Sequence, residues 1–319
     1  MTESANQTAI PGEAIEGVLR AELAHGDALI GTIIPIMRHL IANDDQSVFS
    51  EEIVARTRGM LEHLARQLLD ARAAALDEAE RRDHPREELE MLTLGLSADN
   101  GLLSHVHALA LEWQLTERLH ARLGHDPVLS PLLQALIASN DAGVSVVAMH
   151  LLAAQARFVQ GQRRMQLTLT ELPADLLHIA VVTLRHQFGV DDQGAARAEI
   201  TLSKEYDEGR SRFGLLSRAV LSMGGGAVAS LSIDHAGVAL FLTALSIATG
   251  QERSLCVLAT NESQLARLAL GLSAAGLKPG TVEEQFLALH PEVALPSGFE
   301  QLGADRAAAI LATGAGYPA

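Results

Sequence analysis

The sequence contains few aromatic residues, one cysteine and two lysines, and each shortage excludes something. Aromatic residues make up 3% of the 319 positions, whereas β-sheets of this size normally use many Tyr, Phe and Trp side chains in alternating runs. A β-sheet core is therefore disfavoured. The single cysteine, Cys256, excludes an intramolecular disulfide. Its apolar neighbours indicate a small core side chain in a reducing compartment.

Long apolar runs and excess positive charge are also missing. No run reaches the roughly 18 uninterrupted apolar residues that a membrane-spanning helix needs, and the polar N-terminus does not resemble a signal peptide. The 39 acidic and 24 basic residues give a formal net charge of -15, which repels nucleic acid and anionic membranes. We therefore expect a cytoplasmic protein that binds neither.

Apolar residues are abundant, at 48% of the chain, and their pattern is helical. Residues 234–250 and 261–276 share one layout, with a capping residue, an amphipathic Ala/Leu-rich run and a final glycine. Asp234 and Asn261 are predicted to cap the free amides of the first turn. Gly250 and Gly276 are predicted to end the helices in the left-handed conformation. Much of the chain repeats this arrangement, which predicts an all-α fold.

Charge and proline patterns suggest how the helices are organised. We expect a disordered tail over residues 1–10 and an N-terminal helical hairpin over 11–82 that acts as an oligomerisation unit. The densely charged stretch at 77–90 separates this hairpin from a body over 83–319. Within the body, residues 191–223 are predicted to be helical with a polar middle. The many short helices favour an irregular HEAT-like arrangement of stacked helical hairpins.

Two passages resemble a known family. They are AMHLLAAQARFVQGQRRMQLTLTELPADLLH at 148–178 and ALFLTALSIATGQERSLCVLATNESQLARLALGLSAAGLKPGTVEEQF at 239–286. Together they resemble the bacterial "domain of unknown function 2336" family over roughly residues 95–295. The resemblance implies a helical, repeat-like fold and no catalytic residues.

An apolar stripe runs along the first predicted helix and has to be covered. Ile15, Leu19, Ile33 and Leu40 lie on one helical face. An exposed stripe of this length marks an interaction surface, and self-association is the simplest cover. We therefore predict a homodimer formed through the first two helices.

Three acid-x-x-His pairs suggest a metal site, because residues i and i+3 share a helix face. Two Glu-x-x-His pairs on facing helices help to build the carboxylate-bridged di-metal sites of ferritin-like bundles. Acidic residues are common enough here for chance to supply such pairs, so we expect no cofactor and keep a di-metal protein as an alternative. The candidates are Glu22 with His25, Glu117 with His120, and Asp175 with His178. Glu22 and Glu117 fall on the apolar sides of their helices, so we expect their carboxylates to face the core.

Other histidines suggest other chemistry. His105 and His107 are two residues apart on a predicted helix and point in opposite directions, so we expect one exposed and one packed side chain. His39 and His63 lie on long helices, as phosphorelay histidines do, although neither is followed by the usual lysine and glycine. Histidine phosphotransfer is therefore a second alternative.

A cluster of arginines follows an apolar helix. Arg157, Arg163 and Arg164 are expected near the helix C-terminus, where cations complement the helix dipole. They can also receive a phosphate or an acidic partner. With no catalytic motif in the sequence, we predict a non-enzymatic scaffold or adaptor that binds another protein.

Overall fold

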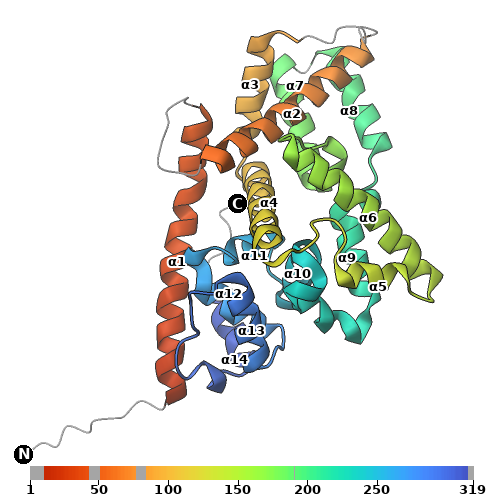
Figure 1. The fold of residues 1–319 in the computed structure, drawn as a ribbon. Coiled ribbons are helices and arrows are strands. Elements are labelled where there is room, and N and C mark those ends of the chain that lie inside the picture. The colour runs from red at the N-terminus through yellow and green to blue at the C-terminus, as the bar shows by residue number, and fades with distance from the viewer. Residues whose placement is uncertain (1–10, 43–50, 77–83, 190, 315–319) are drawn as a thin grey trace, which may run out of the picture.

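The computed structural model describes residues 11–42, 51–76, 84–189 and 191–314, and within these ranges the protein is all helical, as predicted (Figure 1). No strand occurs in these ranges. The elements are α1 (Pro11–Ala42), α2 (Glu51–Ala75), α3 (Arg86–Ser97), α4 (Asn100–Leu123), α5 (Pro131–Ile137), α6 (Ala142–Arg163), η1 (Leu169–Glu171), α7 (Ala174–Phe188), α8 (Gln193–Glu205), η2 (Glu208–Arg210), α9 (Arg212–Ser222), η3 (Gly224–Leu231), α10 (Ile233–Thr249), α11 (Arg253–Ala259), η4 (Glu262–Gln264), α12 (Leu265–Ala274), α13 (Pro279–Leu289), η5 (Phe299–Gln301) and α14 (Ala304–Leu311).

Helix α4 passes through the middle of the molecule and joins two cores (Figure 1). The upper core consists of buried side chains from α1, α2, α3, α4, α7 and α8, among them Leu64 and Leu103. The lower core takes side chains from α1, α4, α5, α6 and the helices from α9 onward, among them Leu119 and Phe241. Because α4 has neighbours on nearly every side, it buries polar residues as well as apolar ones.

The apolar side of α1 is covered by the chain's own helices. Ile15 and Leu19 are buried in the lower core, where α1 packs on α12 and α14. Leu40 is also buried, and Ile33 is half-buried. These four residues are therefore not a free interaction surface, which corrects that prediction. The homodimer itself stays a prediction, without the support that an uncovered stripe would provide.

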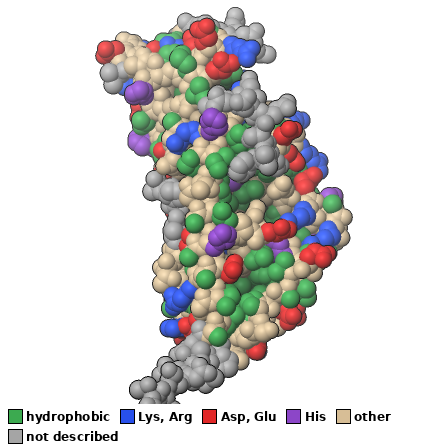
Figure 2. Space-filling model, turned by 90° about the vertical axis from the view of Figure 1, so that its left-hand side faces the viewer, with side chains coloured by type: hydrophobic (Ala, Val, Ile, Leu, Met, Phe, Trp, Pro, Cys, Tyr) green, Lys and Arg blue, Asp and Glu red, His purple; other side chains and the backbone are tan. Residues whose placement is uncertain are grey.

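The outer face of α1 carries only scattered apolar side chains. Val18 is 50% exposed and Leu29 is 39% exposed. Figure 2 views the molecule from the side of α1 and shows apolar patches interrupted by charged and other side chains. Ion pairs of Glu16 with Arg306 and of Asp27 with Arg267 also tie α1 to the C-terminal helices.

The two cores cross the predicted boundary between hairpin and body. Helix α2 packs more extensively on α3 and α8 than on α1, so α1 and α2 do not form a hairpin closed on itself. Helix lengths vary from 7 residues in α5 to 32 in α1. The domain limits and the HEAT-like stacking stay predictions. The predicted tail at 1–10 lies outside the described residues, as does much of the charged stretch.

The two matched stretches are helical as predicted, with two corrections. Gly237, at φ 70° and ψ 168°, breaks α10 near its start, and the predicted cap of α10 is also wrong. Gly250 and Gly276 adopt φ of 67° and 89°, the left-handed conformation expected after a helix. Asn261 accepts a hydrogen bond from the Ser263 amide and caps η4. Asp234 is not the cap, because α10 begins one residue before it. Its carboxylate instead lies 3.1 Å from His125 Nε2.

The predicted helix over residues 191–223 is broken in its polar middle. Helix α8 ends at Glu205, and α9 begins at Arg212. Between them, Asp207 accepts a hydrogen bond from the Gly209 amide, and Ser211 accepts one from the Gly214 amide. These short-range bonds satisfy amides at new helix starts and so interrupt the helix. The resulting turn becomes important below, because it lines a cavity.

Helix α6 is long and apolar enough to cross a membrane, judged by length and composition alone. Two bent pairs, α9 with η3 and α10 with α11, also pass this test when each is counted as one span. In the folded protein α6 packs on α5 and α9. The expected lack of a membrane partner stays a prediction.

Candidate functional site

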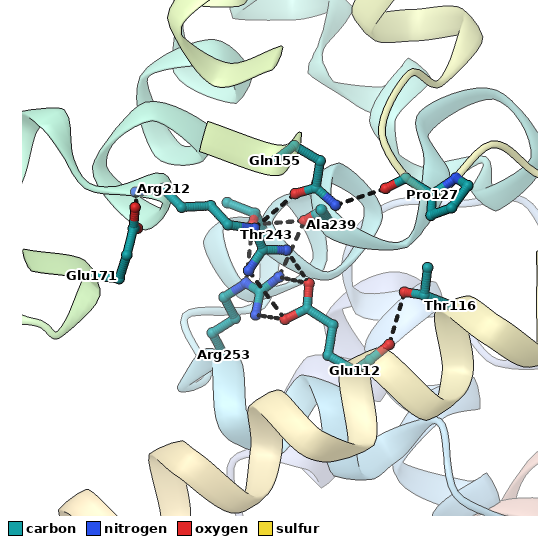
Figure 3. A network of polar contacts seen from close by, with 9 residues as sticks. All are labelled: Glu112, Thr116, Pro127, Gln155, Glu171, Arg212, Ala239, Thr243 and Arg253. Carbon is teal, nitrogen blue, oxygen red and sulfur yellow. Dashed lines mark hydrogen bonds and ion pairs between the residues drawn. The ribbon is translucent and has the colours of Figure 1, made fainter. Parts of the chain in front are cut away.

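A buried carboxylate, Glu112 on α4, binds two arginines at the centre of the molecule (Figure 3). Arg253 donates through Nη1 to Oε2 over 2.7 Å and through Nη2 to Oε1 over 2.9 Å. Arg212 donates to Oε1 through Nη2. The side chains of Glu112 and Arg212 are only 1% and 2% exposed. We call Glu112, Arg212 and Arg253 the buried ion network.

Neighbouring groups satisfy the remaining donors of the buried ion network. Gln155 on α6 accepts a hydrogen bond from Arg212 Nε over 2.7 Å and donates to the Pro127 carbonyl over 2.8 Å. Thr243 accepts one from Arg253 Nε over 3.1 Å. The Arg212 guanidinium also lies 3.7 Å from the centre of the Phe158 ring, a favourable cation–π contact. The network therefore joins α4, α6, α9, α10 and α11.

The charges of this network determine the ionisation of Glu112. Burial alone raises a carboxyl pKa, but the positive charges of Arg212 and Arg253 and their hydrogen bonds outweigh burial and hold the pKa of Glu112 at about 2. A carboxylate ionised this firmly and shared by two guanidiniums has no free lone pair for proton transfer. The buried ion network is therefore a structural clamp.

The predicted metal pairs are not directed into the core. Their six side chains are all exposed, which corrects the expectation that Glu22 and Glu117 face it. The buried carboxylate of α4 is Glu112, and it binds arginines. Within the described ranges, no three His, Cys, Asp or Glu side chains gather closely enough to hold a metal ion. The exposed side chains are Glu22, His25, Glu117, His120, Asp175 and His178.

His105 and His107 are both at least partly enclosed, so the expected exposed member of the pair is absent. His107 is 5% exposed, and His105 keeps some surface although its Nε2 is enclosed. Burial lowers the pKa of each to about 4. Their surroundings differ, since His105 makes an edge-to-face contact with Phe213.

A polar cavity of about 510 Å³ opens between α2, the end of α6, η1 and the turn after α8. Three arginines line it, Arg157, Arg164 and Arg210, and we call it the arginine groove. Its volume lies within the roughly 300–1,000 Å³ of typical ligand sites. The other lining residues are His63, Phe158, Gln160, Gly161, Gln166, Leu167, Thr168, Thr170, Glu171, Glu205 and Asp207.

The arginines of the groove differ from those of the buried ion network because their guanidiniums are exposed and have no partner among the described residues. The side chains of Arg157, Arg164 and Arg210 make no hydrogen bond or ion pair with any residue that the structure describes. Helix α6 ends at Arg163, with Arg164 following as its cap residue, as predicted. Arg163 is exposed but does not line the groove. The predicted arginine cluster therefore contributes two of its three members.

The acidic residues of the groove are partly engaged. The Glu171 carboxylate accepts a hydrogen bond from the Arg212 amide over 2.7 Å. Burial raises the pKa of Glu171, against this bond and the positive charges of Arg212 and Arg157. Asp207 accepts the Gly209 amide. Glu205, at the end of α8, is exposed and makes no hydrogen bond or ion pair with the described residues.

Of the two phosphorelay candidates, only His63 belongs to the groove. His63 Nδ1 lies 2.7 Å from the Leu167 carbonyl oxygen, and the ring lines the cavity. His39 is exposed on α1, which takes no part in the groove. The structure therefore brings together His63, Arg157 and Arg164, which the sequence suggested separately.

No family model, curated protein or solved structure matches this chain. The resemblance to the "domain of unknown function 2336" family accordingly stays a prediction. Any function has to be inferred from the groove itself.

Sequence reasoning missed Glu112 and Arg210. A sequence with one apolar face predicts that a polar residue such as Glu112 is exposed. Helix α4, however, is surrounded by other helices, so its polar side chains are buried as well. An acidic residue between Leu111 and Trp113 was the available signal. Arg210 was overlooked because it was placed inside a continuous helix. The signal was readable there, because Asp207 and Ser211 are both residue types that cap the start of a helix.

Proposed function

We propose that this protein is a cytoplasmic, non-enzymatic adaptor that binds a phosphorylated side chain of a partner protein in the arginine groove. One observation carries the proposal. Arg157, Arg164 and Arg210 line the same cavity, and their guanidiniums make no hydrogen bond or ion pair with the described residues.

A phosphate group suits these donors. Guanidinium groups present planar pairs of N–H donors that match phosphate oxygens, and such charge-assisted bonds are about twice as strong as neutral ones. The hydroxyls of Thr168 and Thr170 form a hydrogen bond with each other over 3.2 Å on the same wall, which leaves one of the two O–H groups to donate to a ligand. Two of the three acids in the groove already accept backbone amides, so the arginines remain available.

A group carried by a protein suits the groove better than a free small molecule or a nucleic acid. Small-molecule sites usually bury 70–90% or more of their ligand. Here the arginines, the two threonines, Glu205 and Asp207 are all exposed, so a phosphate can enter while it remains attached to a large partner. The net charge of -15 opposes an extended polyanion.

The test compares phosphorylated and unphosphorylated peptides. A phosphoserine peptide library with randomised flanks, its unphosphorylated twin, inorganic phosphate and a single-stranded oligonucleotide are titrated against the full chain. We expect the phosphopeptides to bind at least about tenfold more tightly than their unphosphorylated twins. Equal binding of the twins, or preference for the oligonucleotide, overturns the proposal.

A matched pair of variants locates the binding. Arg157→Gln with Arg164→Gln removes two groove guanidiniums, and we expect it to abolish measurable phosphopeptide binding. Arg163→Gln removes a neighbouring charge that does not line the groove, and we expect wild-type binding. Retention of binding by the double variant contradicts the proposed site.

A further inference from the structure

His63 is held in one orientation by the residues around it. Its Nδ1 lies 2.7 Å from the Leu167 carbonyl oxygen. Gln67, one turn further along α2, places its Nε2 2.9 Å from that same oxygen and 3.0 Å from the His63 carbonyl oxygen. Gln67 Oε1 accepts a hydrogen bond from the Leu169 amide over 3.1 Å. The ring and the loop beside it are thus tied together.

These contacts determine which ring nitrogen carries the proton. A carbonyl oxygen only accepts hydrogen bonds, so a separation of 2.7 Å requires a proton on His63 Nδ1. Gln67 Nε2 also lies 2.8 Å from His63 Nδ1, but both N–H groups of this amide have carbonyl acceptors, and the amide does not have to donate to Nδ1. The neutral ring therefore keeps its lone pair on Nε2, because the bond made by one nitrogen determines the state of the other.

The loop that carries Leu167 is packed tightly on α2. Gly59 allows this approach, since a Cβ there would lie 2.8 Å from Met165 Cβ. Met165 adopts φ of 55°, which is uncommon for a residue other than glycine. Arg56 donates to the Gln162 carbonyl from the same side of α2. These contacts hold the loop from Arg164 to Leu167 beside His63.

We propose that His63 is phosphorylated on Nε2 by an acyl phosphate presented in the arginine groove. This inference rests on the proposed function, because the phosphoryl group enters through the site that binds phosphate. His63 lines the same cavity as Arg157 and Arg164. Their guanidiniums bind the phosphoryl oxygens and stabilise the charge that develops during transfer.

The transfer balances without any co-reactant. The Nε2 lone pair forms the N–P bond as the P–O bond to the acyl group breaks, and the carboxylate leaves with that electron pair. Nothing is oxidised or reduced, and no proton moves. The product is a phosphorylated imidazolium that keeps its Nδ1 proton on the Leu167 carbonyl, and this hydrogen bond stabilises the positive ring.

The experiment treats the full chain with acetyl phosphate as the acyl phosphate probe. Intact mass shows whether a phosphoryl group is added, and peptide mapping above neutral pH, where the N–P bond survives, locates it. We expect the label on His63, no label in His63→Gln, and labelling at least about tenfold slower in the variant that lacks Arg157 and Arg164. Arg163→Gln and His178→Gln, which change neighbouring charge and a distant exposed histidine, should label like wild type.

The two proposals fail separately. Label spread over exposed histidines such as His39, or no label on His63 in a protein that binds phosphopeptides, overturns the phosphorylation alone. Label on His63 in a protein that binds no phosphopeptide overturns the adaptor function alone. Mapping on the wild-type chain decides the site of labelling even when a variant fails to fold.

Discussion

The buried ion network and the arginine groove use the same side chain in opposite ways. In the network, Arg212 and Arg253 share the carboxylate of Glu112, and their side chains are 2% and 17% exposed. In the groove, Arg157, Arg164 and Arg210 face solvent without a bonded partner among the described residues. An enclosed charge is costly unless it is paired, whereas an exposed one remains hydrated. Paired arginines therefore stabilise this fold, and the unpaired ones are available to a ligand.

The two regions are neighbours. Phe158 lines the groove and contacts the Arg212 guanidinium, and Glu171 lines it while accepting the Arg212 amide. The groove is thus built against the network, whose rigidity positions Phe158 and Glu171. Substitutions in the network should mainly change stability, and substitutions in the groove should mainly change binding.

The largest effect is expected from breaking the network. Glu112→Gln leaves Arg212 and Arg253 without a counter-charge, and we expect it to lower the free energy of unfolding by about 3–5 kcal/mol. Glu199→Gln, which removes the more exposed ion pair with Arg185, should cost less than about 1 kcal/mol. Urea unfolding followed by circular dichroism measures both, and equal small losses would show that the network is not a clamp.

The second-largest expected effect is a loss of folding stability at acid pH, caused by buried histidines. The folded-state pKa of His107 is about 4 against an ordinary 6.5, so the unfolded chain takes up its proton first. The contribution of His107 to stability is therefore intact above pH 6.5 and is lost as the pH drops from 6.5 to 4, by up to about 3 kcal/mol. His105, whose folded-state pKa is also about 4, adds a loss over the same range. Glu112 adds a separate loss as the pH falls from 4.5 toward 2.

The pH dependence is measured by urea unfolding between pH 6.5 and 4. His107→Leu should show a flatter dependence than wild type because it removes the buried base. His150→Gln, at an exposed position on α6, should follow wild type. If His107→Leu is as acid-sensitive as wild type, the loss of stability is caused by another group.

Substitutions in the arginine groove should weaken phosphopeptide binding and leave the free energy of unfolding nearly unchanged. Arg164→Gln should weaken phosphopeptide binding about tenfold, or about 1.4 kcal/mol, and change the free energy of unfolding by no more than about 0.5 kcal/mol. Arg212→Gln should instead mainly lower the free energy of unfolding. A large loss of stability in Arg164→Gln would place this arginine in the structural set.

The smallest expected effect is an increase in phosphopeptide affinity. Glu205 adds an uncommitted negative charge to the groove, so Glu205→Gln should strengthen phosphopeptide binding about two- to fivefold through reduced repulsion. The gain should shrink as salt is added, because exposed charges are screened. Isothermal titration at two salt concentrations measures it, and weaker binding in this variant would mean that Glu205 contributes a favourable contact to the peptide.

The sequence predicted helices well and the site only in pieces. Gly250 and Gly276 end helices as expected because a left-handed turn is a local property of glycine. Glu22 and Glu117 were assigned to the core and are exposed, because helical periodicity does not show which neighbours a face will meet. Ile15 and Leu19 were correctly identified as apolar but were assigned to the wrong partner. Helices α12 and α14, more than 200 residues further along the chain, pack over these two side chains.

By itself, the sequence determined that this protein is all helical, where several helices end and which arginines lie near the end of α6. Those properties depend on short stretches of chain, where capping, glycine and periodic apolar residues act locally. Only the tertiary structure decided which arginines are paired and which are free. His63 meets Leu167 across 104 positions, and Glu112 meets Arg253 across 141. Long-range packing encloses one set of charges and leaves the other in water, and that difference in solvation separates the clamp from the site.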